Sequence, residues 1–327
     1  MIIIGIPKEK KINECRVGLT PKAVKELTTG HGYCVQIEKD AGLASGYSND
    51  DYIAAGAEIV LLSANHFHLR RAKLIAKVKE PLPEEYLFFI SGEKAVAGFF
   101  HFSANPELWQ FFQKNNIKFL DYGEVVDENG GRSILAAMSK IAGESAALAG
   151  FFYLRQPFGG CGIMPNDAVV TVVGAGVAGT AAINTALNLK IKKIFVLDVK
   201  EYAIFASGKF LNTRLSSAEN IAEILPQTDL LISAPAFKGK PAPKIFTREM
   251  IRMMKKGSVF IDISIDEGGS SETSRPTTHE KPVYVEEGVL HYCVANIPGA
   301  VPKSASSALS EAALPYLIQF LANLYLK

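Results

Sequence analysis

The stretch VVTVVGAGVAG (residues 169–179) places Gly174, Gly176 and Gly179 in the spacing G-x-G-x-x-G. By itself this hexapeptide is a weak signal, because glycines also gather in ordinary turns. Here it follows an apolar run typical of a strand and opens an alanine-rich segment with helical spacing. In that context the first glycine makes the turn, the second lets the backbone approach a pyrophosphate, and the third lets helix pack on strand. The stretch therefore predicts a dinucleotide site with the pyrophosphate at the positive end of the helix.

The next apolar run, IKKIFVLD, ends on Asp198, near the spacing of about twenty residues expected for a ribose-binding acid. A carboxylate there can accept hydrogen bonds from the ribose hydroxyls and would repel a 2′-phosphate, which favours NAD over NADP. The simpler alternative is that Asp198 only faces solvent at a strand end. Lys200, two residues on, leaves some room for phosphate and weakens the exclusion of NADP.

The composition indicates an ordinary globular protein with room for two domains. The chain has 327 residues, 48% of them hydrophobic and 21% charged. A net charge of +2 is too small to indicate nucleic acid or an anionic membrane as the main partner. The four cysteines include no C-x-x-C pair, and the histidines of HFH (66–68) lack a third ligand at suitable spacing, so we expect no metal site. The cysteine pattern and a first segment that reads as a strand, without a leader, favour a cytoplasmic location.

Apolar runs alternate with helix-starting signals along the whole chain, which predicts an α/β fold with parallel sheets. Thr20, Asn105 and Ser48 are expected helix N-caps, and Trp109 is expected in the core. We predict two Rossmann-like doubly wound domains, with an NAD-binding domain (138–299) inserted into a catalytic, substrate-binding domain (1–137 and 300–327). The expected strands of the first series are residues 2–6, 33–37, 74–79, 95–100 and 117–122. The expected strands of the second series lie in the stretches DAVVTVVG, IKKIFVLD, TDLLISA, GSVFIDIS and VLHYCVA. We expect a last helix over residues 304–327.

Polar residues stand where several predicted strands end, which is where parallel sheets bind ligands. Arg16 lies between the first strand and its helix, Lys79 and His101 end two further strands, and Asp266 follows VFIDISI. Alone, each would more often be structural. Together they suit a small 2-amino or 2-oxo acid that exchanges hydride with NAD. Arg16 offers a planar fork for a carboxylate, and Lys79 a compact charge that could polarise a carbonyl or steady the same substrate. His101 offers a general acid/base near neutral pH, and Asp266 a carboxylate that could orient a water, an amine or the nicotinamide ribose.

Motifs in order over nearly the whole chain resemble the alanine dehydrogenases, within the group that shares its fold with the NAD-binding subunit of proton-translocating transhydrogenase. SRPTTH and VANIPGAVP are far more specific than the glycine pattern; others are KVKEP, GIPKEKKINECRVGLTPKAVKEL, HFSANPEL and AAMSKIAG.

The resemblance implies reversible oxidative deamination of L-alanine to pyruvate and ammonia, a step of amino-acid catabolism. It implies that Arg16 and Lys79 bind the substrate carboxylate and that His101 and Asp266 serve the acid/base steps. It further implies that Ser139 lies near the nicotinamide or the NAD phosphates, that Asn296 borders the cleft, and that the protein is a homodimer or hexamer.

The chain also departs from this family. The segments after Gly159 and after Asp198 are shorter than is typical, and relatives continue beyond the position of Lys327. Two alternatives therefore stand beside an alanine dehydrogenase. One is an opine- or saccharopine-type amino-acid dehydrogenase, and the other is a non-catalytic paralogue that binds NAD.

Overall fold

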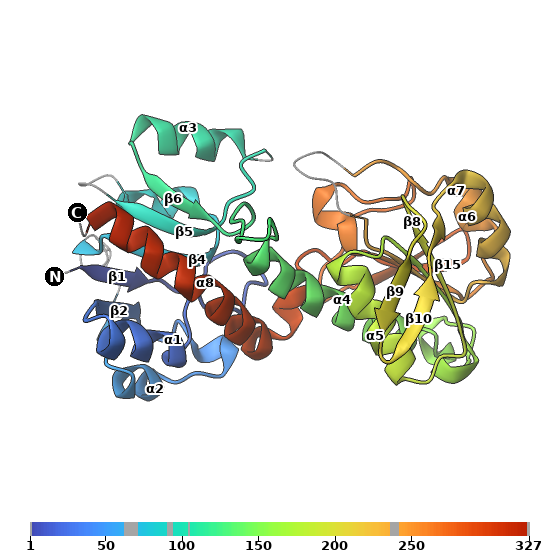
Figure 1. The fold of residues 1–327 in the computed structure, drawn as a ribbon, viewed down its shortest axis with the longest axis horizontal. Helices are drawn as coiled ribbons and strands as arrows, with labels where there is room; N and C mark the ends of the chain where they lie inside the picture. The colour runs from blue at the N-terminus through green and yellow to red at the C-terminus, as the bar shows by residue number, and fades with distance from the viewer. Residues whose placement is uncertain (1, 62–70, 90–93, 104, 236–241, 326–327) are drawn as a thin grey trace. The chain divides into compact units, whose positions relative to one another are not determined.

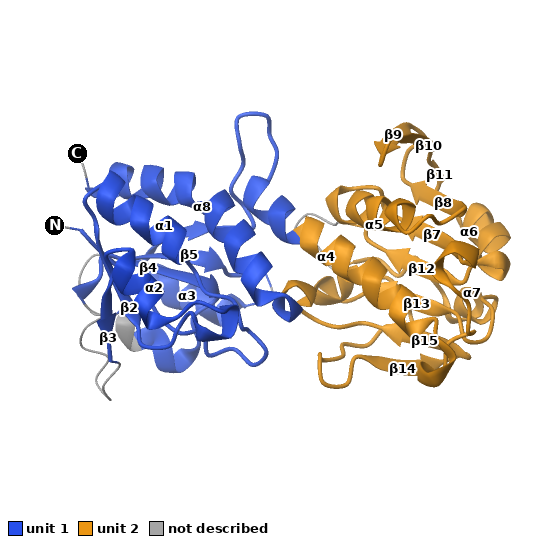
Figure 2. Ribbon diagram, turned by 90° about the horizontal axis from the view of Figure 1, so that it is seen from below, with its two compact units in different colours: residues 1–138, 299–327 blue, residues 139–298 orange. Residues whose placement is uncertain are grey.

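The computed structural model describes residues 2–61, 71–89, 94–103, 105–235 and 242–325. Its contacts divide the chain into two compact units: unit 1 comprises residues 1–138 and 299–327, and unit 2 comprises residues 139–298 (Figure 2). The histidine pair at 66–68 lies outside the described residues.

Unit 1 is built on a six-stranded sheet in the order β3-β2-β1-β4-β5-β6. Every pairing among these strands is parallel. The strand order reverses between β1 and β4, which makes that point the topological switch of a doubly wound sheet. The predicted α/β class is confirmed here, and only the short strand β3 was not expected. The strands are β1 (Ile3–Ile6), β2 (Cys34–Glu38), β3 (Glu58–Val60), β4 (Leu74–Lys79), β5 (Ala95–Phe99) and β6 (Lys118–Asp121).

Four α-helices of the described chain cover this sheet (Figure 1). The C-terminal helix α8 comes from the far end of the sequence and packs beside α1. Its apolar residues Leu309, Ala313 and Leu317 are buried, as their helical spacing predicts. The helices are α1 (Pro21–Lys25, continued by a π-helical turn Glu26–Gly30), α2 (Asn49–Ala54), α3 (Pro106–Lys114) and α8 (Pro302–Tyr325).

The helix-cap predictions had mixed outcomes. Ser48 and Asp51 form the expected capping box at the start of α2. Thr20 and Asn105 occupy N-cap positions, but in the described chain neither side chain makes the capping hydrogen bond.

The prediction that Trp109 lies in the core was wrong. Its side chain is 41% exposed and packs edge-on against Phe102, with the ring centroids 5.1 Å apart.

The long helix α4 (Ser133–Tyr153) runs from unit 1 into unit 2. By length and composition it could cross a membrane, and 44% of its apolar window is buried within the structure. Ala146, Ala147 and Phe151 lie in the hydrophobic core of unit 2. Its apolar character is therefore accounted for by core packing.

Unit 2 has a seven-stranded sheet in the order β11-β8-β7-β12-β13-β15-β14, again with a reversal next to its first strand, β7. The pairings are parallel except that of the edge strand β14 with β15. The five predicted strands are present, whereas β11, β14 and a hairpin after Asp198 were not expected. The strands are β7 (Val169–Val173), β8 (Lys193–Asp198), β9 (Ala203–Ala206), β10 (Lys209–Asn212), β11 (Arg214–Leu215), β12 (Leu230–Ser233), β13 (Val259–Asp262), β14 (Val283–Glu286) and β15 (Val289–Tyr292); the helices are α5 (Val177–Asn188), α6 (Ala218–Ile224) and α7 (Arg248–Arg252).

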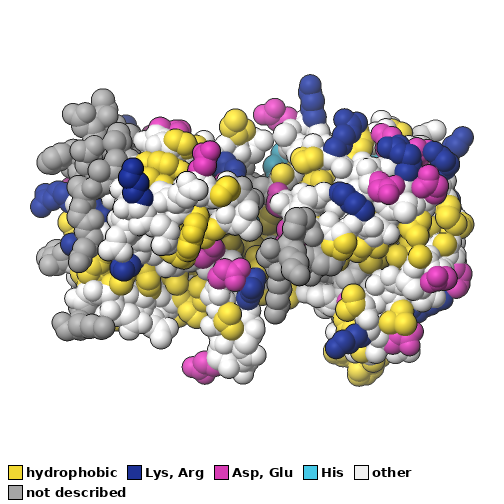
Figure 3. Space-filling model, turned by 90° about the horizontal axis from the view of Figure 1, so that it is seen from above, with side chains coloured by type: hydrophobic (Ala, Val, Ile, Leu, Met, Phe, Trp, Pro, Cys, Tyr) yellow, Lys and Arg dark blue, Asp and Glu magenta, His cyan; other side chains and the backbone are white. Residues whose placement is uncertain are grey.

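Charged side chains of both signs are interspersed over the face drawn in Figure 3. This distribution agrees with the small net charge of the chain.

Candidate active site

Three of the proposed site residues share one edge of the unit 1 sheet. Arg16 follows β1, Lys79 ends β4 and His101 follows β5. These strands are consecutive neighbours and all run parallel, so their carboxyl ends meet at the same edge. Arg16 and Lys79 flank the switch point, where a doubly wound sheet leaves room for a ligand.

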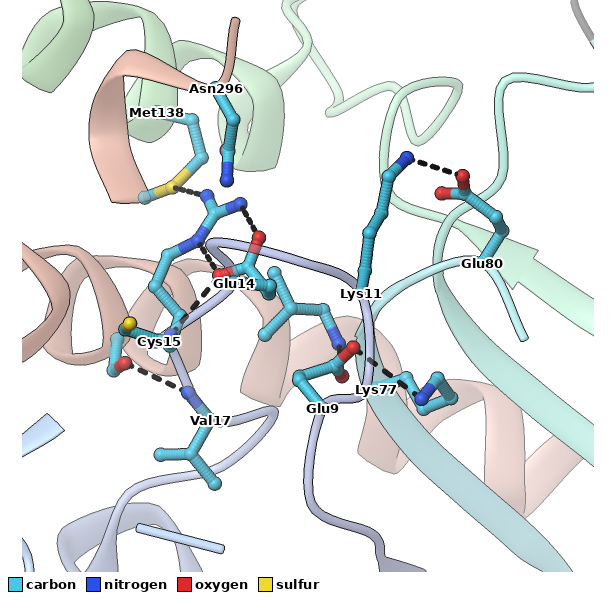
Figure 4. A network of polar contacts seen from close by, with 12 residues as sticks. Glu9, Lys11, Glu14, Cys15, Val17, Lys77, Glu80, Met138 and Asn296 are labelled. Atoms are coloured by element: carbon cyan, nitrogen blue, oxygen red, sulfur yellow. Dashed lines mark hydrogen bonds and ion pairs between the residues drawn. The ribbon is translucent and has the colours of Figure 1, made fainter. Parts of the chain in front are cut away.

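Arg16 is held by an acid that the sequence reasoning did not single out. Glu14 Oε1 accepts from Arg16 Nε at 2.7 Å, and Glu14 Oε2 accepts from Arg16 Nη2 at 2.5 Å (Figure 4). Arg16 Nη1 lies 3.3 Å from Met138 Sδ. Both charged residues are buried, with Arg16 3% and Glu14 7% exposed. Glu14 thus occupies the Nε–Nη2 edge of the predicted fork.

Electrostatics keep Glu14 ionised. Its burial by itself would raise the carboxyl pKa, but the hydrogen bonds and charge of Arg16, with a contribution from Lys79, leave the pKa below its usual value. The contribution of Lys79 indicates that its charge lies near this pair.

Serines of the C-terminal helix α8 support the Arg16 loop. Ser306 Oγ accepts from the Val17 N–H and Ser310 Oγ from the Thr20 N–H, both at 3.0 Å. Ser45 Oγ lies 2.9 Å from Ser306 Oγ and donates to the Cys15 carbonyl at 2.8 Å. The i, i+4 spacing of the two α8 serines places them on one helix face, which is the signal that could have found them.

Lys79 ends a strand that carries a second, fully buried lysine. Lys77 is 0% exposed, and its Nζ lies 2.8 Å from Glu85 Oε1 and 3.4 Å from Glu9 Oε2. Lys79 itself is only partly buried. The sequence offered a signal for Lys77, since a lysine inside a strand covered on both faces must have a charged partner.

His101 stands in an unusual backbone conformation at the edge of unit 1. Its φ is 48°, in the left-handed region that few non-glycine residues occupy. Asn105 donates through Nδ2 to the carbonyls of Phe100 and His101, both at 3.2 Å, which holds this turn. The imidazole is exposed and lies 6.4 Å, centroid to centroid, from the ring of Phe99.

In unit 2 the three glycines fit the roles expected of a dinucleotide loop. Gly174 has φ 92°, and a Cβ there would lie 2.7 Å from the Ala234 backbone. A Cβ on Gly179 would lie 1.8 Å from the Gly174 carbonyl oxygen, where α5 packs on β7. A Cβ on Gly176 would meet no atom of the described chain within 4 Å. The space beside Gly176, at the N-terminus of α5, is open, and the loop can therefore accommodate a pyrophosphate.

Asp198 ends β8 beside this loop. Its Oδ2 accepts from the Ala175 N–H at 2.6 Å and from the Tyr202 hydroxyl at 3.2 Å, and its Oδ1 accepts from the Val199 N–H at 2.6 Å. The carboxylate thereby holds the glycine loop, a role beyond the predicted one.

Ser139 lies on α4, four residues before Gly143 and so on the same helix face. A Cβ on Gly143 would lie 1.9 Å from the carbonyl oxygen of Ala178, in the first turn of α5. The face of α4 that carries Ser139 thus packs against the start of the glycine-loop helix.

Asp266 and Asn296 lie together in unit 2. Asp266 stands in a 3₁₀ turn (Ile263–Glu267) after β13, and its Oδ2 accepts from the Asn296 N–H at 3.2 Å. Asn296 has φ 59° and its carbonyl lies 3.2 Å from His279 Nε2. Buried Asp262 orders the turn by accepting from the Ser270 N–H at 2.7 Å. Two predicted site residues thus contact each other, although the sequence separates them by thirty positions.

Comparisons with known proteins cover the whole chain. The family model "Alanine dehydrogenase/PNT, N-terminal domain" matches residues 5–142, and "Alanine dehydrogenase/PNT, C-terminal domain" matches residues 146–327. The alanine dehydrogenase of Bacillus subtilis (strain 168) is 40% identical over 97% of this chain and 85% of its own length.

Solved structures agree. An L-alanine dehydrogenase superposes with a TM-score of 0.89 at 34% identity, covering 100% of this chain and 91% of its own. A transhydrogenase from Sinorhizobium meliloti superposes with a TM-score of 0.82 at 26% identity, covering 98% and 94%.

Proposed function

The chain belongs to the alanine dehydrogenase/PNT family, and from this premise we propose that it catalyses the NAD-dependent, reversible oxidative deamination of L-alanine to pyruvate and ammonia. The observation that supports the proposal is the strand order: Arg16 follows β1, Lys79 ends β4 and His101 follows β5, three neighbouring parallel strands. Two cations and an imidazole suit a small acid whose neighbouring carbon changes oxidation state.

In this proposal unit 1 binds the substrate. Arg16, aligned by Glu14, pairs with the carboxylate. Lys79 neutralises the same carboxylate or polarises the carbonyl of pyruvate. Residues 1–137 and 300–327 then form the substrate domain.

Residues 138–299 form the NAD-binding domain in this proposal. Gly174, Gly176, Gly179 and the N-terminus of α5 would hold the pyrophosphate, Asp198 the adenosine ribose, and Ser139 the region of the nicotinamide or phosphates. NAD, when bound, supplies the acceptor for the hydride of the alanine α-carbon.

His101 and Asp266 would manage the protons. Imine hydrolysis needs a base for the attacking water and an acid for the departing ammonia, and His101 is suited to both near neutral pH. The contact with the Asn296 N–H orients Asp266, and Asn296 would border the substrate.

The test is an assay of purified protein with L-alanine and NAD, followed at 340 nm, in parallel with Lys79→Ala and His101→Ala. The wild type should form NADH and the variants should lose most of that rate. No turnover of small amino acids by a wild type that binds NAD would refute the proposal and favour the non-catalytic paralogue.

A reductive assay separates the opine-type alternative. Pyruvate and NADH should be consumed with ammonia as the amine, and a preference for an amino acid as the amine would indicate an opine or saccharopine dehydrogenase. A cytoplasmic homodimer or hexamer completes the proposal, and light scattering measures the assembly state.

A further inference from the structure

A cluster of three buried charges lies under the proposed substrate edge of unit 1. Glu9, Lys77 and Glu85 have side chains only 1–2% exposed, and both carboxylates pair with the one ammonium (Figure 4 shows Glu9 and Lys77). Desolvating three charges costs several kcal/mol, and such clusters are often no more stabilising than apolar residues of the same size. Stability alone therefore does not account for this arrangement.

Both carboxylates of the cluster also hold backbone on either side of Lys79. Glu9 Oε1 accepts from the Val78 N–H at 2.7 Å, one residue before it. Glu85 Oε2 accepts from the Leu82 N–H at 2.8 Å, three residues after it. Lys77 joins the two acids, so one buried ion group spans the strand end and the turn that follows.

The backbone needs this support because β4 is irregular here. Ala76 pairs with Ala97 and Lys79 with Phe99, so three steps on β4 face two on β5. A bulge of this kind interrupts the ladder and redirects the following side chain. The Val78 N–H, which lies within the irregularity, is the donor that Glu9 engages.

We propose that Glu9 and Glu85, joined by Lys77, are positioning residues that hold the β4 bulge so that Lys79 meets the substrate carboxylate. The proposal rests on the proposed function, because it assigns Lys79 to the substrate. It adds a role for Glu9 and Glu85, whose carboxylates accept hydrogen bonds from backbone N–H groups rather than contact the substrate.

Two substitutions at Glu9 separate positioning from ion pairing. Glu9→Gln keeps an acceptor oxygen at the same reach but removes the charge, whereas Glu9→Asp keeps the charge but is one methylene too short for the Val78 N–H. We expect Glu9→Asp to raise the KM for pyruvate about tenfold, the effect of one lost hydrogen bond to a charged group, with the KM for NADH unchanged. Glu9→Gln should raise the pyruvate KM about threefold or less.

Lys10→Met, which removes an exposed charge next to Glu9, is the matched control and should leave both KM values unchanged. The same comparison of Asp with Gln can be made at Glu85, whose carboxylate accepts from the Leu82 N–H. If Glu9→Asp fails to fold, the variants Glu85→Asp and Glu85→Gln take the place of the two Glu9 variants. The proposal is overturned if Gln impairs pyruvate binding more than Asp does, if neither changes it, or if the KM for NADH rises by the same factor. A wild type without alanine dehydrogenase activity would instead refute the proposed function, so the two failures are distinguishable.

Discussion

Glu14 and Arg16 form a bidentate ion pair inside unit 1, with Arg16 Nε 2.7 Å from Glu14 Oε1 and Arg16 Nη2 2.5 Å from Glu14 Oε2. The backbone N–H of Arg16 donates to the same carboxylate at 3.1 Å. The acid therefore fixes both the side chain and the main chain of the proposed substrate-binding arginine.

Glu14→Gln should weaken both folding and substrate binding. Breaking a buried ion pair from one side leaves an uncompensated charge, so we expect the free energy of unfolding to fall by about 3 kcal/mol. The KM for pyruvate should rise about tenfold as Arg16 loses its alignment. Urea denaturation at pH 7 and steady-state kinetics measure the two effects.

The same ion pair predicts that the free energy of unfolding decreases at acid pH. The folded-state pKa of Glu14 is lowered from an unfolded value of 4.5, so the pair stabilises the native state above pH 4.5 and this contribution is lost as the pH falls through the lower folded pKa. Glu14→Gln should flatten that part of the stability curve. An identical decrease at acid pH in both proteins would contradict the assignment.

Alanine substitution at two of the loop glycines should affect different properties: Gly179→Ala should lower stability, and Gly176→Ala should weaken NAD binding. Gly179→Ala places a Cβ 1.8 Å from the Gly174 carbonyl oxygen, and the overpacking should destabilise unit 2 by about 3 kcal/mol. Gly176→Ala meets no atom of the described chain within 4 Å, so the melting temperature should be unchanged. Its Kd for NAD should nevertheless rise at least about tenfold, because the methyl group takes the place of the pyrophosphate. Calorimetry and NAD titration of both variants test this, and normal NAD binding by Gly176→Ala would contradict the proposed phosphate site.

Asp198→Asn should relax the preference for NAD. The amide oxygen can still accept from the Ala175 N–H, although the Val199 N–H loses its acceptor, and the charge that repels a 2′-phosphate is gone. We expect the ratio of kcat/KM values for NAD and NADP to fall about tenfold. Lys200→Met is the control, and it should reduce the use of NADP. A ratio unaffected by Asp198→Asn would show that another residue selects the cofactor.

The buried His291 predicts a loss of stability in mild acid. It is 0% exposed, with Nε2 2.7 Å from Thr273 Oγ1 and Nδ1 3.0 Å from the Val289 carbonyl oxygen. Burial lowers the pKa of this imidazole from its usual 6.5. The unfolded chain therefore takes up a proton near pH 6.5 while the folded one stays neutral, and stability present above pH 6.5 is lost as the pH falls through the lower folded pKa.

His291→Gln should remove this dependence even if it is less stable throughout. Melting temperatures of both proteins between pH 8 and pH 5, compared as differences from their own values at pH 8, measure the effect. Equal slopes would show that other groups cause any acid sensitivity.

Local signals predicted the strands and the glycine loop well. The apolar run before Gly174 and the helix after it are contiguous in the chain, so their pattern alone specifies a strand, a turn and a helix. Strand-end placement led to Arg16, Lys79 and His101, because parallel topology brings carboxyl ends to one edge. The hairpin of β9 and β10 was missed because a two-stranded unit carries little periodic signal.

The fold class and the residue types proposed for the site could be predicted from the sequence, because periodicity and motif spacing are properties of neighbouring residues. How the cations are held became visible only in the three-dimensional structure. Ser306 meets Val17 across 289 positions, and Lys77 meets Glu9 although α1, β2, α2 and β3 lie between them in the sequence. Glu14 faces Arg16 rather than solvent because burial makes an unpaired guanidinium costly. No local pattern encodes the pairing of Ser306 with Val17 or of Lys77 with Glu9, since both depend on which segments the packed sheet brings together.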